Sequence, residues 1–312
     1  GALERVGVRG GAYVGVGPDQ NFSYIARVRP SIAYVVDIRR DNLLQHLLFK
    51  ALFARARNRA EYVALLLGRP VPADVARWSD RGIDAIVAWA DATPATPESQ
   101  RHAIAVVRAE VERYGVPLAP ADLATIDRFH GEFIAKGMDL QFTSAGRPPR
   151  PYYPTLRQLV QERDLEGRQA SYLAREADFQ FVKELERRDL VIPVVGNLAG
   201  EHALAAIGRH VRGRGERVSA FYVSNVEDYL LRDGSFPAYA RTVAALPRDA
   251  RSVMIRSWFG GSRGMPHPQG VAGYASTQLL QSMDAFVRAT ASPDGGFASY
   301  RELAFSEHLP LK

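Results

Sequence analysis

Two glycines and one carboxylate near the start of the chain have the types and spacing of a nucleotide-binding turn. Gly15 and Gly17 end the apolar run at 12–17, and their lack of a Cβ atom lets a ligand approach the backbone closely. A helix beginning just after them would offer free N–H groups and a positive partial charge. Asp37 ends the next apolar run, 20 residues beyond Gly17, where a carboxylate can accept hydrogen bonds from the hydroxyls of a ribose.

The residues after the glycines depart from the G-x-G-x-x-G pattern of dinucleotide-binding proteins. Positions 15–20 read Gly-Val-Gly-Pro-Asp-Gln, so Gln20 stands where a third glycine would let the helix pack closely on the strand. Asp19 would in addition repel a diphosphate. The turn therefore favours a ligand without phosphate. In the alternative interpretation, the glycines serve only a tight turn and Asp37 pairs with a nearby arginine at the surface.

Alternating strand and helix patterns surround this turn. Short apolar runs predict strands at 12–16, 32–37, 190–197, 218–225 and 252–258, with an edge strand at 299–305. Periodic apolar residues and end signals predict helices at 21–29, 42–57, 59–67, 73–91, 97–114, 119–136, 155–163, 171–188, 201–211, 237–246 and 275–290. Asn21 and Asn42 are expected to cap the first two. The alternation predicts an α/β fold with a doubly wound, mostly parallel Rossmann-like sheet.

A long, mainly helical segment interrupts this alternation. Residues 58–170 are therefore expected to form a helical insertion, and residues 1–57 and 171–312 to form the Rossmann-like cofactor-binding core. The insertion could close as a lid over the strand ends, with Phe142, Tyr152 and Tyr153 reaching a substrate. It could equally form the surface of a homodimer, and the sequence leaves both alternatives open.

Composition argues against several other classes of protein. The 312 residues include no cysteine, which excludes disulfides, thiolate metal sites and a cysteine nucleophile and fits a reducing cytoplasm. The net charge is +6, but the basic residues are nearly all arginine and are scattered among acidic ones, so nucleic acid is not expected as a partner. No apolar stretch approaches the ~20 residues of a membrane helix, and no membrane association is expected. Histidines and carboxylates lack metal-ligand spacing, and no metal is expected.

The glycine turn and the later strands together resemble class I S-adenosylmethionine-dependent methyltransferases. In that family, the first motif is an apolar strand that ends in a G-x-G turn, and an acidic residue ends the second strand. The stretches VVGNLAG (194–200), FYVSNVEDYL (221–230) and RSVMIRSW (251–258) resemble the third, fourth and fifth strand motifs. The resemblance covers 10–57 and 190–258, about half of the chain, and the GVGPDQNF stretch is also similar to bacterial proteins.

The resemblance implies S-adenosylmethionine as the cofactor. The residues expected to contact it are Gly15, Gly17, Pro18, Asp19, Gln20, Asp37, Ile38, Arg39, Gly196, Asn197, Leu198 and Ser224. In the third motif of that family, a glycine followed by an acidic residue reads the adenine ring. Here Asn197 follows Gly196, and an amide can still form a hydrogen bond with a base edge.

The polar cluster after the fourth strand carries the candidate catalytic residues. A methyl acceptor must be deprotonated or aligned, and Glu227, Asp228 or Tyr229 could serve as the base or orient the acceptor. Asn225 could hold the amine or hydroxyl of the acceptor. Alternatively, Asn225 caps a turn and Asp228 is a solvated surface acid.

These patterns favour transfer of a methyl group from S-adenosylmethionine to an N or O acceptor on a small molecule. Two alternatives remain open. In an NAD(P)-dependent oxidoreductase, Arg39 and Arg40 could meet the 2′-phosphate of NADP. The chain could also be a noncatalytic binding protein that retains the fold, which Asn197 in place of an acid would fit.

Overall fold

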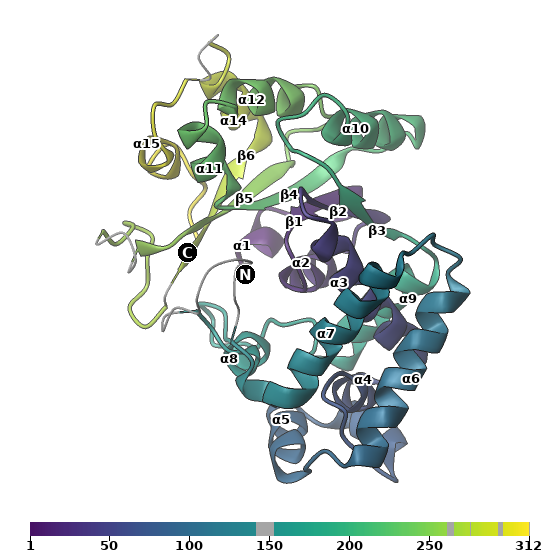
Figure 1. The fold of residues 1–312 in the computed structure, drawn as a ribbon. Helices are drawn as coiled ribbons and strands as arrows, with labels where there is room; N and C mark the ends of the chain where they lie inside the picture. The colour runs from purple at the N-terminus through teal and green to yellow at the C-terminus, as the bar shows by residue number, and fades with distance from the viewer. Residues whose placement is uncertain (142–152, 261–264, 275, 293–295, 312) are drawn as a thin grey trace. The chain divides into compact units, whose positions relative to one another are not determined.

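The computed structural model describes residues 1–141, 153–260, 265–274, 276–292 and 296–311 (Figure 1). Contacts divide the chain into two compact units. The sheet unit comprises Gly1–Gly17, Arg27–Arg39 and Val191–Lys312, and the helical unit comprises Pro18–Ala26 and Arg40–Leu190. The predicted substrate contacts Phe142 and Tyr152 lie outside the described residues. The division into a core and an insertion over 58–170, and the lid or dimer role of that insertion, stay predictions.

The sheet unit is built on a six-stranded mixed sheet. Its strands are β1 (Ala12–Val16), β2 (Ile32–Asp37), β3 (Val191–Val195), β4 (Val218–Ser224), β5 (Val253–Trp258) and β6 (Thr277–Ser282), and their spatial order is β3-β2-β1-β4-β5-β6. The first five strands are parallel, and β6 runs antiparallel to β5 at the edge. The predicted α/β class and the mostly parallel sheet are confirmed.

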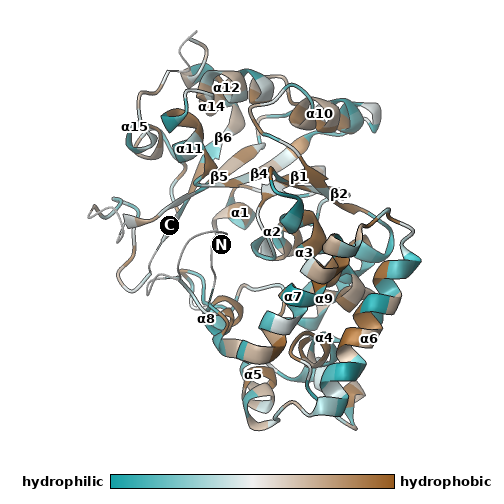
Figure 2. Ribbon diagram, in the orientation of Figure 1, coloured by the Kyte–Doolittle hydropathy of each residue, from teal (hydrophilic) through white to brown (hydrophobic). Residues whose placement is uncertain are grey.

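Burial explains why these runs form strands. All residues of β1 are buried, and so are all residues of β2 except its last. Branched and aromatic side chains such as Val14 and Tyr34 suit strands that are covered on both faces. Val14 pairs with Tyr34 on one side and with Phe221 of β4 on the other, which sets the register of the central strand. Figure 2 shows the hydrophobic colouring along β1 and β2.

Short helices complete the sheet unit. They are α1 (Ala2–Arg5), α10 (Ala203–Gly213), α11 (Val226–Arg232), α12 (Phe236–Ala244), α14 (Met283–Ala289) and α15 (Tyr300–Ala304). Helices α10, α12 and α14 lie over one face of the sheet (Figure 1). On that face, Tyr239 of α12 contacts both Phe221 of β4 and Phe286 of α14. Helix α2 (Gln20–Val28) follows the glycine turn, and only its last two residues belong to this unit.

The helical unit packs around α3 (Arg40–Arg55). Its other helices are α4 (Arg59–Leu66), η1 (Val75–Asp80), α5 (Ile83–Ala92), α6 (Pro97–Arg113), α7 (Pro120–Lys136), η2 (Gly137–Asp139), α8 (Leu156–Gln161) and α9 (Glu176–Arg187), of which η1 and η2 are 3₁₀ helices. Helix α3 is buried over most of its length and contacts α6, α7 and α9. The rings of Phe22, Phe53, Tyr62 and Tyr172 contact one another beside it. Within the described ranges, no helix combines the length and apolarity needed to cross a membrane.

Two predictions near the C-terminus are wrong. The stretch 275–290 is predicted as one helix, but it forms β6 and then α14. Pairing with β5 decides the first half, because Leu279 is fully buried beside that strand and strand neighbours outweigh a local helical pattern. The predicted edge strand 299–305 is instead α15, which begins where the Ser299 side chain accepts the Glu302 N–H at 3.2 Å.

Smaller differences concern the ends of other helices. The predicted helix 73–91 divides into η1 and α5, because the backbone is extended at Arg81 and Gly82. Asn21 and Asn42 lie inside helices that begin one and two residues earlier, and both are buried, so neither is a cap. Helix α11 forms directly after β4, where no helix is predicted, with two acidic residues in its first turn that favour a helix start.

Candidate functional site

The order of the strands brings the predicted binding residues of the sheet unit to one edge of the sheet. From β1 the chain proceeds to β2 and β3 on one side, whereas β4, β5 and β6 lie on the other side. In open α/β sheets, ligands bind outside the carboxyl ends of the strands where this order reverses. The residues at or just after the carboxyl ends of β1, β2, β3 and β4 are Gly17, Asp37, Gly196 and Ser224. Residues from four predicted motifs thus stand at neighbouring strand ends.

Gly17 has a backbone conformation that glycine adopts readily and other residues do not. Its φ is +79°, and a Cβ atom added there would meet no heavy atom of the described residues within 4 Å. The requirement for glycine therefore comes from the turn itself rather than from crowding by the described residues. Gly15 is different, because it lies buried inside β1, paired with Val35 of β2 and Tyr222 of β4.

Asp37 ends β2 with its carboxylate held by a neighbouring arginine. The Arg39 N–H donates to Oδ1 at 2.9 Å, and the Arg39 guanidinium donates to Oδ1 and Oδ2 at 3.2 and 3.3 Å. The ion pair between Asp37 and a nearby arginine, which is expected if the glycines serve only a tight turn, is therefore present. A carboxylate has about four acceptor positions, so these bonds leave room for a further donor. Ile38 is 68% exposed, and Arg40 pairs with Asp122 within the helical unit.

The loop after β3 is tied to the end of β2. The Gly196 N–H donates to the Asp37 carbonyl oxygen at 2.9 Å, which brings two predicted binding residues side by side. A Cβ atom on Gly196 would lie 2.5 Å from the Cβ atom of Ala203, so glycine is needed for α10 to lie this close. Asn197 is exposed and accepts a backbone N–H two residues on at 2.9 Å, whereas Leu198 is buried.

The residues that follow Gly17 belong to the helical unit. The Asp19 carboxylate accepts hydrogen bonds from its own N–H and from the N–H of Gln20, where α2 begins. Desolvation by burial raises the pKa of Asp19 to about 6, so the carboxylate is mainly ionised at neutral pH. These two bonds satisfy N–H groups at the start of the helix. The Pro18 carbonyl oxygen accepts a side-chain N–H of Asn21 at 2.6 Å, which closes the turn.

The backbone at the end of β4 is strained. Ser224 has a φ of +50°, in the left-handed region that residues other than glycine rarely adopt. Such a conformation costs on the order of 1–3 kcal/mol and recurs at functional sites. The ladder with β5 is irregular between Tyr222 and Ser224. Asn225 is half-buried and does not cap α11 through its side chain, and Tyr229 is 42% exposed with its ring 5.8 Å from the Arg232 guanidinium.

Glu227 lies in the protein interior rather than at this surface. Its side chain is fully buried, and so is Arg256 of β5, whose guanidinium donates to both carboxylate oxygens. Tyr239 donates its hydroxyl to Glu227 at 3.1 Å, and Gln281 accepts a further Arg256 N–H at 2.7 Å. Buried charges are tolerated when they are paired and hydrogen-bonded in this way. The geometry therefore favours a structural role for Glu227 over the role of a base.

Two tyrosine hydroxyls at the same strand ends were not predicted. Tyr222 forms hydrogen bonds with the side chains of Ser224 and Ser257, and burial raises its pKa. Tyr300 of α15 donates its hydroxyl to the carbonyl oxygens of Ser257 at 2.9 Å and of Ser224 at 3.3 Å. Tyr300 follows Ser224 by 76 residues, so no local pattern connects them. Arg256 does leave a signal, because an arginine inside the apolar run VMIRSW needs a buried partner.

A hollow of about 310 Å³ lies between α11 and α15 of the sheet unit. Its lining consists of Asp228, Leu231, Arg232, Ala298, Ser299, Tyr300 and Arg301. Asp228, one of the polar residues predicted after β4, is bonded there to Arg232 rather than solvated alone. Across the part of the chain that the structure describes, no three His, Asp or Glu side chains form a group that could hold a metal ion.

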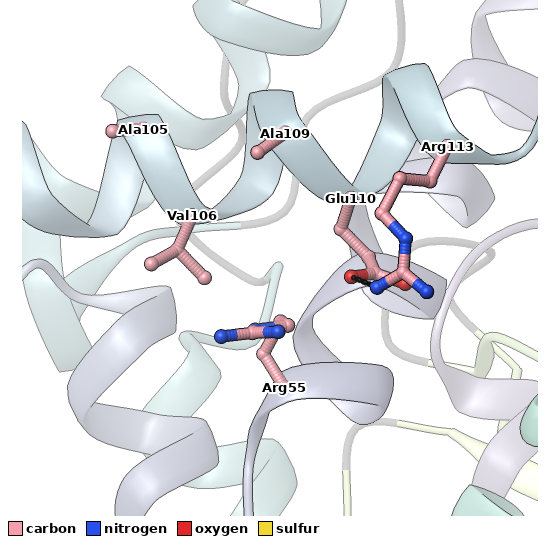
Figure 3. A pocket seen from close by; sticks show the side chains of 6 residues that line it. All are labelled: Arg55, Ala105, Val106, Ala109, Glu110 and Arg113. Carbon is pink, nitrogen blue, oxygen red and sulfur yellow. Dashed lines mark hydrogen bonds and ion pairs between the residues drawn. The ribbon is translucent and has the colours of Figure 1, made fainter.

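A second hollow, in the helical unit, has few polar groups that could bind a ligand. It has a volume of about 280 Å³, and Arg55 of α3 faces α6 across it (Figure 3). The rest of its lining is Ala105, Val106, Ala109, Glu110 and Arg113. Ligand sites combine apolar walls with polar groups that converge on the ligand. Here the Glu110 carboxylate is bonded to Arg113 at 3.1 Å, and none of the predicted site residues lines the hollow.

Comparison with known proteins connects these residues to a family. The family described as Domain of unknown function (DUF7790) matches residues 2–73 and 142–303. The matched ranges include the glycine turn, Asp37 and every strand of the sheet, and they leave out 74–141. A comparison with curated proteins finds no match. Because the matched ranges cover well over half of the chain, this chain belongs to the DUF7790 family.

Proposed function

We propose that the sheet unit binds S-adenosylmethionine at the carboxyl ends of its parallel strands and transfers the methyl group to an N or O acceptor on a small molecule. The strand order β3-β2-β1-β4-β5-β6 supports this most strongly, because it gathers Gly17, Asp37 and Ser224 where the order of strands reverses. The finer description of a doubly wound, Rossmann-like fold with a helical insertion belongs to the same proposal.

Three groups at this edge fit an adenosyl ligand. The lack of a Cβ atom at Gly17 would let the ligand approach the backbone. The Asp37 carboxylate, oriented by Arg39, would accept a hydrogen bond from one ribose hydroxyl. Asn197, next to the Gly196 N–H that joins the two strand ends, would bond the edge of the adenine ring.

Asp19 favours a ligand without phosphate over a dinucleotide. Its carboxylate already accepts the N–H groups at the start of α2 and is mainly ionised at neutral pH. A pyrophosphate on that helix end would have to displace the carboxylate and would be repelled by its charge. This weakens the alternative of an NAD(P)-dependent oxidoreductase. A noncatalytic binding protein would share the same ligand and differ only in the absence of transfer.

The residues of this chain would act by binding and orientation. When bound, S-adenosylmethionine would supply an electrophilic methyl group on a positively charged sulfur, which the lone pair of the acceptor atom would take as the C–S bonding pair returned to sulfur. Asn225 would hold the acceptor at the end of β4, the hydroxyl of the exposed Tyr229 would orient it, and the proton of the acceptor would pass to water. Glu227 would contribute indirectly, by fixing α11 to β5 through Arg256.

Thermal unfolding in the presence of candidate ligands tests this function. A ligand that binds only the native state raises the Tm by linkage, by an amount that grows with its concentration relative to Kd. We expect S-adenosylmethionine and S-adenosylhomocysteine at about 1 mM to raise the Tm, and NAD and NADP to leave it unchanged. A rise with NAD or NADP alone would favour the oxidoreductase. If neither S-adenosyl compound raises the Tm, the proposal is rejected. Binding of S-adenosylmethionine without methyl transfer would favour the noncatalytic alternative.

A further inference from the structure

A buried hydroxyl from the C-terminal part of the chain joins the carboxyl ends of two neighbouring strands. Tyr300 is the first residue of α15 and is only 2% exposed. Its hydroxyl oxygen lies 2.9 Å from the carbonyl oxygen of Ser257 on β5 and 3.3 Å from that of Ser224 on β4. The single hydroxyl proton is shared between the two acceptors, with the shorter bond to Ser257. Tyr300 therefore links the ends of β4 and β5.

Several contacts fix the position of the Tyr300 ring. It stacks on Trp258, with ring centroids 6.0 Å apart and planes inclined by 25°. The Trp258 indole N–H donates to the Met265 carbonyl oxygen at 2.9 Å. At the start of α15, Ser299 accepts the Glu302 N–H at 3.2 Å. The hydroxyl consequently has a defined position relative to the strand ends.

One of the two acceptors belongs to the strained residue of β4. Ser224 has a φ of +50°, whereas a serine without constraints adopts extended or right-handed helical backbone. Such a conformation persists only where the surroundings impose it. The bond from Tyr300 to the Ser224 carbonyl oxygen is one of these constraints. A rotation of the Ser224 backbone would also move the side chain of Asn225, the next residue.

We propose that Tyr300 is a positioning residue that holds the Ser224–Asn225 backbone in the geometry needed at the ligand-binding end of β4, an inference that rests on the proposed function. Tyr300 acts through the Ser224 carbonyl oxygen and is assigned no contact with the ligand or the acceptor. Its effect is to prepare the strand end before the ligand binds, so that binding does not have to order it.

Four variants separate this role from general stabilisation. Tyr300→Phe removes only the hydroxyl. With Ser224→Gly, no contact is needed to hold residue 224 at a positive φ, because glycine adopts a positive φ freely. The double variant Tyr300→Phe/Ser224→Gly combines the two changes. Tyr34→Phe is the matched control, since Tyr34 is equally buried in the sheet unit and its hydroxyl lies 2.9 Å from Nδ1 of His210.

The dissociation constant of S-adenosylhomocysteine, measured by calorimetry, is the readout. We expect Tyr300→Phe to raise the Kd by about tenfold when residue 224 is serine, and by less than about twofold in the Ser224→Gly background. Tyr34→Phe should leave the Kd within about twofold of wild type. An unchanged Kd in folded Tyr300→Phe would overturn the inference. An equal rise in Kd with serine and with glycine at position 224 would also overturn it, since that would indicate a merely structural role.

A second measurement applies if the wild-type protein binds no S-adenosylhomocysteine, in which case the proposed function fails by itself. Backbone hydrogen exchange in the segment 222–230 should then be at least about tenfold faster in Tyr300→Phe than in wild type and in Tyr34→Phe. Equal exchange in the three proteins would overturn the positioning role of Tyr300.

Discussion

Asp37 and Asp249 share one local hydrogen bond and lie toward opposite ends of the parallel strands, and Asp249 in addition accepts the Ser252 hydroxyl at 3.2 Å. Each carboxylate accepts the N–H of the arginine two residues on, at 2.9 Å for Asp37 and 3.0 Å for Asp249, and each is also paired with a guanidinium. Asp37 ends β2, whereas Asp249 precedes β5 and so lies toward the amino ends of the parallel strands. The two aspartates therefore form a matched pair that differs in its place relative to the proposed ligand site.

Asp37→Ala is expected to weaken S-adenosylhomocysteine binding by at least about tenfold, because a hydrogen bond to a charged group contributes about 1.5–3 kcal/mol. Asp249→Ala should leave the affinity unchanged. Asp249→Ala, which breaks an exposed ion pair, should lose no more than about 1 kcal/mol of unfolding free energy. Asp37→Ala should remain folded. Calorimetry gives the affinities and urea unfolding the stabilities. A folded Asp37→Ala protein with wild-type affinity would show that the ribose is bound elsewhere.

The sequence predicts the places of Gly17 and Asp37, because each follows a short apolar run and such runs become parallel neighbours. It does not predict the direction of a side chain. The polar residues around Glu227 predict an exposed side chain. Its carboxylate is instead buried against Arg256, which follows it by 29 residues in the sequence. The sequence predicts an edge strand around Tyr300, whereas Tyr300 begins a helix and bonds the ends of two strands. Both contacts depend on the tertiary fold, which local patterns do not contain.

Among the helices and strands, the pair of Arg256 and Glu227 attaches α11 to the sheet. Both side chains are fully buried. Arg256 also bonds Gln281 of β6 at 2.7 Å and lies 5.1 Å from the Phe286 ring of α14. The Arg256 guanidinium thus connects its own strand, β5, with α11, β6 and α14. Removing either charge alone would leave the other buried without compensation.

Arg256→Met is expected to lower the free energy of unfolding by about 3–5 kcal/mol, the cost of breaking a buried ion pair. Glu227→Gln should cost a similar amount, because it leaves the fully buried Arg256 guanidinium, which cannot lose its proton, beside a neutral amide. The double variant Arg256→Met/Glu227→Gln should be more stable than Arg256→Met alone, with a coupling energy above about 1 kcal/mol in urea unfolding. Additive losses in this double-mutant cycle would contradict a direct pair.

The sequence predicts the first two strands with their observed bounds. A short apolar run bounded by glycine, proline or a charged residue is best buried as a strand of a parallel sheet. The C-terminal elements are not predicted. The stretch TQLLQS has no strong alternation, and its pairing with β5 decides that it is a strand. The stretch YRELA has aromatic and apolar residues that suggested a strand, and the cap at Ser299 decides for a helix.

For the protein as a whole, two buried groups should make stability depend on pH in opposite directions. In the sheet unit, burial and the nearby charge of Arg256 lower the pKa of His308 to about 4. In the helical unit, burial raises the pKa of Glu186 to about 7 although Lys50 lies beside it. The histidine therefore contributes stability above its unfolded pKa of about 6.5 that is lost as the pH falls toward 4. The glutamate contributes stability below about pH 4.3 that is lost as the pH rises through 7.

Neutral replacements should isolate these two contributions. Relative to wild type, His308→Gln should gain unfolding free energy as the pH falls from about 6.5 to 4, and Glu186→Gln should gain it as the pH rises from about 4.5 to 7.5. Each change should amount to about 1 kcal/mol or more in urea unfolding followed across these ranges. A variant whose stability runs parallel to that of wild type over its range would contradict the assigned titration.

The α/β class and the mostly parallel sheet follow from the alternation of short apolar runs with helices. The grouping of Pro18–Ala26 with Arg40–Leu190 does not follow from the sequence, because it depends on which helix faces bury one another. The family match adds that the strands and the glycine turn lie within the shared part of the chain, whereas 74–141 lies outside it.

Titration calorimetry of the wild-type protein with S-adenosylhomocysteine decides whether the strand ends form an adenosyl site. We expect saturable binding of about one ligand per chain with a Kd below about 1 mM, and no binding of NAD or NADP under the same conditions. Saturable binding of NADP together with no binding of S-adenosylhomocysteine would contradict the proposal that Gly17, Asp37 and Asn197 receive an adenosyl ligand without phosphate.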